Sequence, residues 1–374
     1  MAECIRILHV VSVMNRGGIE NMIMNLYRNI DRDKIQFDFV VHYNKKGDFN
    51  DEIKMLGGNI YYAPHFNIYN IFSYKKWWIT FFEKNQEYKI IHSHTYSIAS
   101  IQHKIAKKFG LKTIIHSHST KNSQGIKGVI YHCLQKNIVN ISDYLFACSR
   151  KAGEWLYGVD CEKKSNYYIL NNAIEPKKYV FNQSIKNRLL KKFDLDDKFV
   201  VGHVGNFTPP KNHLYLIDIF SEIHKKEPNS VLMLVGDGNL RKEIENKIDQ
   251  LGLKGSVLLL GVRNNVNDLL QVMDCFVFPS LYEGLPVTVI EAQASGLKCF
   301  ISSNITDEVC ITDLVERISI NISAKEWADK ILNARNYNRK NTEQELISAK
   351  YDIHSTAKWL TQFYLDIVEE NKNE

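Results

Sequence analysis

Short hydrophobic runs, rich in β-branched and aromatic residues, alternate with longer amphipathic segments along the whole chain. Such runs predict strands, and apolar residues spaced three and four positions apart predict helices. In the first half the predicted strands are Ile5–Val13, Phe37–Val41, Asn59–Tyr62, Lys89–His92, Thr113–His116, Tyr144–Ala147 and Tyr167–Leu170. The predicted helices between them are Gly18–Asn29, Asp51–Leu56, Ile71–Glu83, Ile98–Phe109 and Lys127–Asn140.

The same alternation continues in the second half of the chain. Its predicted strands are Phe199–Val204, Val231–Val235, Val257–Leu260, Cys275–Phe278 and Cys299–Ile301. Its predicted helices are His213–Lys225, Leu240–Leu251, Val266–Met273 and Pro286–Ser295. Strands that alternate with helices predict parallel sheets covered on both faces, so an α/β protein is expected.

Two successive blocks of this pattern predict two doubly wound, Rossmann-like domains that face each other across a cleft. A polar stretch at Asn171–Asn182 interrupts the periodicity, which places the first domain at residues 1–178 and the second at 179–353. The last helix, near residues 354–374, carries Leu360, Phe363, Tyr364 and Ile367 on one face. We expect this face to pack back on the first domain.

The composition is that of an ordinary globular protein, because 44% of the 374 residues are hydrophobic and 24% are charged. The formal charge of +6 is mild, which favours contact with anionic lipid or phosphate over nucleic acid. The longest apolar runs, such as Val257–Val262, are too short to cross a bilayer, and the N-terminal run lacks the features of a signal peptide. Seven scattered cysteines without a close pair favour free thiols. These features together predict a cytoplasmic protein.

The segment Pro279–Gly296, PSLYEGLPVTVIEAQASG, combines a strand end, a small loop and a helix start. Proline suits the first helical position, so we expect a helix that begins at Pro286 and offers free backbone N–H groups to an anion. Two carboxylates flank this turn, Glu283 in the loop and Glu291 eight residues later. They can accept hydrogen bonds from sugar hydroxyls on either side of a diphosphate. The plain alternative is a solvated loop residue and a helix-surface residue.

This segment closely resembles the E-x7-E signature of the retaining nucleotide-sugar glycosyltransferases of family four, which have the GT-B fold. The shared features are the Glu-Gly-Leu-Pro run, the second glutamate and the small-residue end Ala294-Ser295-Gly296. The resemblance implies that Glu283 contacts the donor sugar at the catalytic centre and that Glu291 holds the ribose. It also implies that the donor is lined by Gly284, Leu285 and Pro286.

The loop Gly202–Asn212, GHVGNFTPPKN, resembles the family's strand-end loop, which carries an arginine and a lysine against the donor diphosphate. Lys211 matches the lysine, with an implied catalytic role, whereas Asn206 stands at the arginine position. Loss of this bidentate cation would weaken diphosphate binding unless another charge replaces it. Arg263 is the candidate substitute, although it is equally a residue of an ordinary surface turn. Gly236 belongs to a Val-Gly-Asp-Gly loop that lines the nucleotide in this family and lacks the third glycine of a dinucleotide fingerprint.

A glycine-rich turn follows the first strand and opens the first predicted helix. This turn resembles the family's G-G-x-E loop, which lies close to the donor phosphate and the acceptor. The resemblance places Gly17 and Gly18 against the donor and Glu20 on the acceptor side. The alternative is a tight strand-to-helix turn without a ligand.

Two His-Ser-His triplets, His92–His94 and His116–His118, stand at the ends of two predicted strands. Alignment with the family pattern puts His118 at the catalytic histidine that faces the donor sugar, with His94 and His116 as second choices on the acceptor side. Histidines separated by one residue can bind metal, but nothing else in the sequence completes a ligand set. We therefore expect no metal, and a purely structural role stays open for His92 and His116.

The resemblance implies a metal-independent, retaining hexosyltransferase of bacterial exopolysaccharide or capsule biosynthesis. The expected donor is a UDP-sugar, and the expected acceptor is a glycan or a polyprenyl-phosphate-linked sugar. Segment Tyr74–Phe82, YKKWWITFF, either contacts the inner face of the cell membrane or forms a partly buried helix. A non-catalytic GT-B scaffold protein and a GT-B nucleotide-sugar epimerase are the alternatives.

Overall fold

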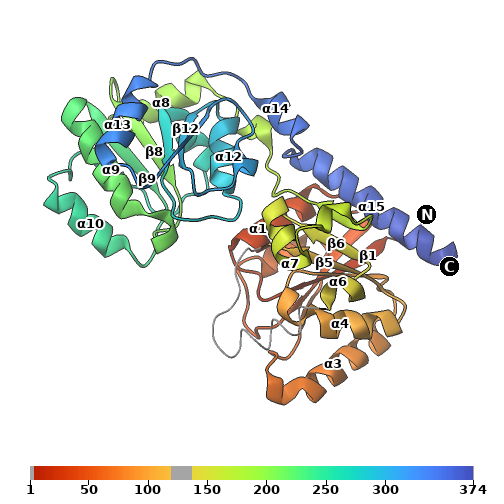
Figure 1. Cartoon of the computed structure of the whole chain (residues 1–374). Helices are drawn as coiled ribbons and strands as arrows, with labels where there is room; N and C mark the ends of the chain where they lie inside the picture. The colour runs from red at the N-terminus through yellow and green to blue at the C-terminus, as the bar shows by residue number, and fades with distance from the viewer. Residues whose placement is uncertain (1–3, 119–136, 374) are drawn as a thin grey trace. The chain divides into compact units, whose positions relative to one another are not determined.

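The computed structural model describes residues 4–118 and 137–373, which form two compact units (Figure 1). The first unit comprises Met1–Ala173 together with Asp352–Glu374, and the second comprises Ile174–Tyr351. The chain therefore leaves the first unit once and returns to it with its last helix.

The described residues of the first unit form a seven-stranded parallel sheet with the order β3-β2-β1-β4-β5-β6-β7. Its strands are β1 (Ile5–Val11), β2 (Ile35–Val41), β3 (Ile60–Tyr62), β4 (Ile90–Ser93), β5 (Lys112–Ser117), β6 (Tyr144–Ala147) and β7 (Tyr167–Ile169). Alternate side chains of β1 enter different cores, since Ile7 and Val11 lie in one core and Leu8 and Val10 in another. Both faces of the sheet are thus buried, which explains why its strands appear in the sequence as continuous hydrophobic runs.

Helices of the first unit cover this sheet and include the last helix of the chain. They are α1 (Gly18–Asn29), α2 (Asn50–Met55), α3 (Ile71–Lys84), α4 (Tyr96–Lys108), α6 (Ile138–Ile141), α7 (Arg150–Tyr157) and α15 (Ile353–Asn373). Helix α15 packs against α1 and places Leu360, Tyr364 and Ile367 in the core shared with β1. The Tyr364 hydroxyl also lies 2.7 Å from Nδ1 of His92 in β4.

An ion pair between the partly exposed Arg6 and the buried Asp38 joins β1 to β2. The side chain of Asp38 has no exposed surface and accepts hydrogen bonds from Nε and Nη2 of Arg6, each at 2.6 Å. It also accepts hydrogen bonds from the Tyr88 hydroxyl at 2.7 Å and from the backbone N–H of Asn59 at 2.6 Å. These four bonds compensate for removing the carboxylate from water.

The second unit contains, within its described residues, a six-stranded parallel sheet with the order β10-β9-β8-β11-β12-β13. Its strands are β8 (Phe199–Val204), β9 (Ser230–Val235), β10 (Val257–Leu259), β11 (Cys275–Phe278), β12 (Lys298–Ser302) and β13 (Val315–Ile318). Its helices are α8 (Gln183–Phe193), α9 (His213–Lys226), α10 (Arg241–Gln250), α11 (Val266–Val272), α12 (Val287–Ala294), α13 (Ala324–Asn333) and α14 (Glu343–Ser348). In β11, Phe276 and Phe278 face one core and Cys275 and Val277 the other, so this sheet is also covered on both faces.

Every strand predicted from the sequence is present, with ends that differ by at most two residues. The structure adds β13 and the helices α7, α8, α13 and α14, which the hydrophobic pattern did not predict. Strand β13 was missed because Glu316 and Arg317 interrupt its apolar pattern at the edge of the sheet. Helix α13 begins with a capping box between Ser323 and Glu326, a signal that could have found it. Most of the predicted helix Lys127–Asn140 lies outside the described residues.

The aromatic segment Tyr74–Phe82 proves to be mostly core. Tyr74, Trp78, Phe81 and Phe82 are buried against the first sheet, so these rings are not available to a membrane. Of the two alternatives for this segment, the structure supports a partly buried helix for these four rings, because helix α3 directs its largest side chains inward.

The cysteines of the described residues are free thiols, as expected, and Cys133 lies outside that part of the chain. Burial raises the pKa of the Cys275 and Cys299 thiols, which keeps both protonated and unreactive near neutral pH. A search of the described residues for a helix both long and apolar enough to cross a membrane finds none.

Candidate active site

The strand order of each sheet reverses once, and ligands of such sheets bind where the order reverses. In the second unit the reversal lies between β8 and β11, where Cys275 pairs with Val201. In the first unit it lies between β1 and β4. The segments that follow these four strands contain the predicted site residues Lys211, Glu283, Gly17 and His94, so topology and sequence motifs select the same sheet edges.

Lys211 and Glu283 meet at the reversal point of the second unit. The Nζ atom of Lys211 lies 2.9 Å from Oε1 of Glu283 and 4.6 Å from the centre of the Phe278 ring. The two charged side chains are only 18% and 15% exposed. Reduced contact with water strengthens the attraction between them and toward any charged ligand at this position.

Hydrogen bonds join the loops that carry this ion pair. The backbone N–H of Leu281 donates to the Pro210 carbonyl at 2.8 Å, and Nδ2 of Asn212 donates to the Pro279 carbonyl at 3.1 Å. Asn212 has a φ of 55°, a left-handed conformation that asparagine tolerates better than most residues. The two loops are thus linked, and the positions of Lys211 and Glu283 depend on each other.

Helix α12 begins at Val287, one residue later than expected. Pro286 is the N-cap, because its ψ of 100° is extended although its φ of −75° suits a helix. Among the described side chains none caps this helix end. The N–H of Val289 donates to the Pro286 carbonyl at 3.1 Å, so the N–H groups of Val287 and Thr288 are the ones that an anion can bind. Leu285 packs partly against the core, and the space where a Cβ of Gly284 would lie is open.

Glu291 lies in α12 and contacts Tyr179, a residue that the sequence motif did not include. Oε1 of Glu291 accepts a hydrogen bond from the Tyr179 hydroxyl at 2.8 Å. Burial raises the pKa of Glu291 to about 7, and the hydrogen bond from Tyr179 opposes this shift. Glu291 is therefore a partly buried acceptor that titrates near neutral pH, which contradicts the alternative of a solvated surface residue.

Several buried polar atoms near the ends of β8 and β11 have no hydrogen-bond partner in the described structure. They are Nε2 of His203, both ring nitrogens of His213, Oγ of Ser280 and Oγ1 of Thr288. The rings of His203 and His213 lie 4.7 Å apart, and burial lowers the pKa of both. Unpaired buried polar groups are rare in proteins, so these atoms are candidate partners for a polar ligand. None of these four residues was predicted from the sequence as part of the site.

Gly236 allows the loops after β8 and β9 to approach each other closely. Its φ of 141° favours glycine, and a Cβ there would collide with the carbonyl oxygen of Gly205. The backbone of Gly236 also donates to the Gly261 carbonyl at 2.9 Å, which brings the turn containing Arg263 beside it. The side chains of Asn206 and Arg263 are both exposed, and no ion pair involves Arg263 in the described part of the chain.

In the first unit, the glycine-rich turn caps helix α1. Gly17 is the N-cap, and its carbonyl accepts hydrogen bonds from the backbone and side chain of Asn21 at 3.0 and 2.8 Å. The carboxylate of Glu20 lies against Gly17, and burial raises the pKa of Glu20. Gly18 has open space around it, so the start of α1 remains accessible.

The ends of β1, β4 and β5 bring five histidines together within the described residues. Nδ1 of His9 lies 3.0 Å from Nε2 of His94, and Nδ1 of His94 lies 2.8 Å from Nε2 of His118. Nε2 of His92 lies 3.3 Å from Nδ1 of His116. His9 was not predicted from the sequence. The described residues contain two groups of three histidines, in each of which one ligand atom per residue lies within 4.8 Å of the others, so the expectation that nothing completes a ligand set is wrong.

Two protein-family models match the chain, one over most of each structural unit. The family model described as Glycosyltransferase Family 4 matches residues 16–178, and the model described as Glycosyl transferases group 1 matches residues 186–351. The chain is also 33% identical over 377 residues to the putative glycosyltransferase EpsF of Bacillus subtilis, with 98% of each chain covered. The chain belongs to these glycosyltransferases.

Two further relatives of this glycosyltransferase carry more specific names. It is 26% identical over 370 residues to the capsular polysaccharide biosynthesis glycosyltransferase CapH of Staphylococcus aureus, covering 96% of this chain and 99% of CapH. It is 29% identical over 311 residues to the UDP-Gal:alpha-D-GlcNAc-diphosphoundecaprenol alpha-1,3-galactosyltransferase of Escherichia coli, covering 76% and 77% of the two chains.

The fold of the glycosyltransferase is GT-B. The crystal structure of Anabaena HepE in complex with UDP matches it with a TM-score of 0.72 at 18% identity, with 98% of both chains covered. The predicted fold class is thereby confirmed.

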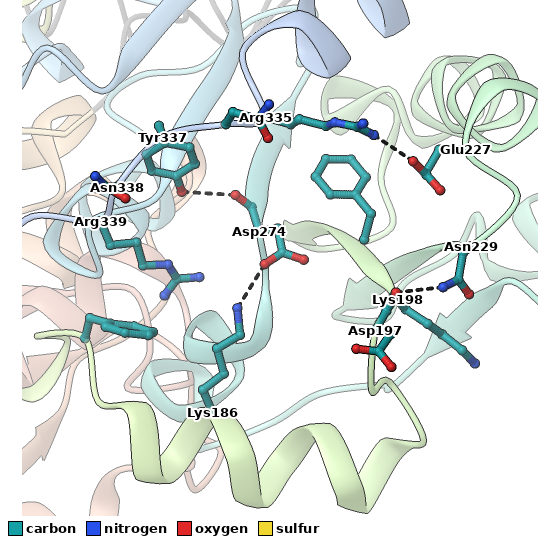
Figure 2. Close-up of a pocket in the computed structure, with 13 residues that line it drawn as sticks. Lys186, Asp197, Lys198, Glu227, Asn229, Asp274, Arg335, Tyr337, Asn338 and Arg339 are labelled. Atoms are coloured by element: carbon teal, nitrogen blue, oxygen red, sulfur yellow. Dashed lines mark hydrogen bonds and ion pairs between the residues drawn. The ribbon is translucent and has the colours of Figure 1, made fainter.

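A separate polar cavity of about 620 Å³ lies in the second unit of the glycosyltransferase (Figure 2). Its walls include Phe199 at the start of β8 and Asp274 just before β11, which places it at the amino-terminal edge of the sheet. Lys186 pairs with Asp274 at 3.0 Å, and Arg335 pairs with Glu227 at 2.6 Å. None of the predicted site residues lines this cavity, and these two ion pairs join four of its charged side chains.

Proposed function

We propose that this glycosyltransferase retains anomeric configuration as it transfers a sugar from a UDP-sugar to a lipid-linked or oligosaccharide acceptor in bacterial polysaccharide biosynthesis. The observation that carries the proposal is the Lys211–Glu283 ion pair beside the open start of α12, at the reversal point of the second sheet. The named activities of CapH and the E. coli galactosyltransferase support the polysaccharide pathway and the lipid-linked acceptor. The UDP complex of HepE supports the nucleotide.

In this proposal, positive charge at the reversal point stabilises the leaving diphosphate. Lys211 and the first N–H groups of α12 bind its oxygens, as preorganised donors that need no metal ion at the diphosphate. Asn206 stands at the position where the family has an arginine, and Arg263 supplies the missing positive charge. Glu283 positions the donor sugar. Its carboxylate becomes free to do so when Lys211 binds the diphosphate and no longer pairs with Glu283.

The other predicted residues surround the two ends of the donor. Glu291 accepts hydrogen bonds from the ribose hydroxyls, and Gly236 lies at the nucleotide. In the first unit, Gly17 and Gly18 approach the phosphates, and His118 faces the donor sugar. Glu20, His94 and His116 belong to the acceptor side.

The direct test is to incubate the protein with a panel of UDP- and GDP-sugars, with and without a bacterial lipid extract, and to measure released nucleotide. We expect release from a UDP-sugar that increases with the lipid extract, and a product whose anomeric configuration by NMR equals that of the donor. Nucleotide binding without release would contradict the proposal and favour a scaffold protein. Conversion of the sugar without an acceptor would favour an epimerase.

The pH dependence of donor use tests the role of Glu291. Because burial raises the pKa of Glu291 to about 7, the residue is a protonated, weaker acceptor below this pH and a carboxylate above it. We expect kcat/KM for the donor to rise as the pH increases through about 7, since this ratio reports ionisations of the free enzyme. In the variant Glu291→Gln the donor KM should increase and this rise should disappear.

Tyr179→Phe is the matched control for this experiment. Its hydroxyl donates to Glu291 and thereby lowers the pKa of that carboxyl, so its removal should move the rise in kcat/KM to higher pH. An identical pH profile in the wild type and in Glu291→Gln would contradict the ribose-binding role.

We also propose that the protein binds the cytoplasmic face of the membrane through the exposed face of α3. Tyr69 precedes this helix and is 99% exposed, and Phe72 in its first turn is 82% exposed. Phe72, Lys75, Lys76 and Ile79 share one helical face through their spacing of three and four residues, and all are exposed. Exposed aromatic rings beside lysines suit an interface with anionic lipid.

Binding to lipid vesicles tests this surface. The double variant Tyr69→Ser/Phe72→Ser should bind vesicles that contain phosphatidylglycerol at least about tenfold more weakly, because two apolar side chains no longer enter the interface. Met55→Ser is the matched control, since Met55 is 78% exposed on α2 outside this surface. Equal binding by the double variant and the wild type would show that lipid contacts another surface.

A further inference from the structure

The histidine cluster at the carboxyl end of the first sheet comprises His9, His92, His94, His116 and His118. All except His118 are buried, and His118 is half-buried. One ring nitrogen from each of His94, His116 and His118 lies within 4.8 Å of the others. Histidine is the commonest protein ligand of d-block metals, and three imidazoles form a complete protein ligand set for an open Zn²⁺ site.

In two of these three ligands, the ring nitrogen on the far side from the proposed cation is held in place. Nε2 of His94 lies 3.0 Å from His9, and Nδ1 of His116 lies 3.3 Å from His92. His92 is fixed in turn by the Tyr364 hydroxyl at 2.7 Å. Such outer partners are typical of metal sites, because they orient the ligand rings. Nε2 of His116 is buried and has no partner within the described residues, so it is available to a cation.

We propose that His94, His116 and His118 bind one divalent cation of the Zn²⁺ class. With Zn–N bonds of about 2.1 Å in a tetrahedral site, the ligand nitrogens lie about 3.4 Å apart. The nitrogens of His94 and His118, now 2.8 Å apart, separate by about 0.6 Å on this basis, while the wider pairs close. The partly exposed ring of His118 is the entry route, and solvent fills the remaining coordination position.

Cobalt titration tests the site. The untagged, full-length chain is freed of metal with a chelator, desalted and titrated with Co²⁺, whose d–d absorption is strong in a low-coordinate nitrogen site. We expect one equivalent to bind with this absorption and Zn²⁺ to displace it. His116→Gln and His118→Ala should each weaken binding at least about hundredfold, more than the loss of an outer partner commonly does.

Two further variants make the result specific. His65→Ala removes an exposed histidine of the same unit and should leave the Co²⁺ spectrum unchanged. Tyr364→Phe removes the outermost partner of the network, and a smaller loss of affinity than in His116→Gln is expected. Circular dichroism on each variant distinguishes lost binding from lost folding. If a variant does not fold, the same histidine is replaced with asparagine instead.

Absence of the absorption at one equivalent, or the same absorption in folded His116→Gln and His118→Ala, would overturn the proposal. The five rings would then hold each other by hydrogen bonds alone. The titration contains neither donor nor acceptor, so its failure would leave the proposed sugar transfer untouched.

Discussion

Replacing Lys211 with alanine should lower the rate of sugar transfer about 10²–10³-fold, because one preorganised donor to a developing oxyanion commonly contributes about 3–4 kcal/mol. The effect should fall mainly on kcat, since the charge on the leaving diphosphate increases as the bond to the sugar breaks. Steady-state assays of released UDP, with the donor identified by the panel above, give kcat and KM separately.

Glu283→Gln should also abolish most transfer while leaving UDP affinity nearly unchanged.

The ion pair complicates a single substitution, because removing Lys211 leaves the carboxylate of Glu283 without its 2.9 Å partner. The double variant Lys211→Ala/Glu283→Gln removes both charges and distinguishes lost catalysis from a disturbed loop. Lys254→Ala is the control, as that side chain is 84% exposed. A value of kcat/KM for Lys211→Ala within threefold of wild type would refute the assignment of this lysine to the diphosphate.

Replacing Asp38 with alanine should destabilise the first unit by about 3–5 kcal/mol, because it removes a fully buried carboxylate that accepts four hydrogen bonds and leaves the partly exposed guanidinium of Arg6 without its partner. The substitution removes the shared acceptor of Arg6, Tyr88 and the Asn59 backbone and leaves these donors without it. Urea unfolding followed by tryptophan fluorescence suits the measurement, because four of the five tryptophans, namely Trp77, Trp78, Trp155 and Trp359, belong to this unit.

Asp51→Ala provides the surface comparison for this prediction. Its carboxylate pairs with Lys46 but is 75% exposed, so its loss should cost less than about 1 kcal/mol. Equal unfolding midpoints for Asp38→Ala and Asp51→Ala would show that the buried network contributes little to stability. Because the chain has two units, the transition of the first unit should be fitted separately.

The strands and the α/β architecture could be predicted from the sequence, because strands buried on both faces of a sheet appear as continuous apolar runs. The predicted run Cys275–Phe278 coincides with β11, and the predicted helix Gly18–Asn29 coincides with α1. Helix α8 was missed because its composition, QSIKNRLLKKF, is mostly polar and only Leu189 is buried. Its stability depends on tertiary packing against α11, which periodicity cannot reveal.

Site residues could be predicted from the sequence only where they belong to a short motif that directly follows a strand. Lys211 was expected at the donor diphosphate and Glu283 at the donor sugar, and the structure brings the two side chains into contact across 72 positions of sequence. Tyr179 was missed because it lies 112 residues from Glu291, and such pairings depend on packing between distant elements. His9 was missed for a similar reason, as only the pairing of β1 with β4 brings it beside His94.

The return of α15 to the first unit affects the order in which the protein is completed during synthesis. The second unit is one uninterrupted stretch, whereas the core of the first requires Leu360, Tyr364 and Ile367 from the end of the chain. At about 5–20 residues per second, a ribosome needs roughly 10–35 s to translate the intervening 174–351. During this time the earlier-made sheet lacks its closing helix and leaves apolar surface uncovered, so the domain that begins first is finished last.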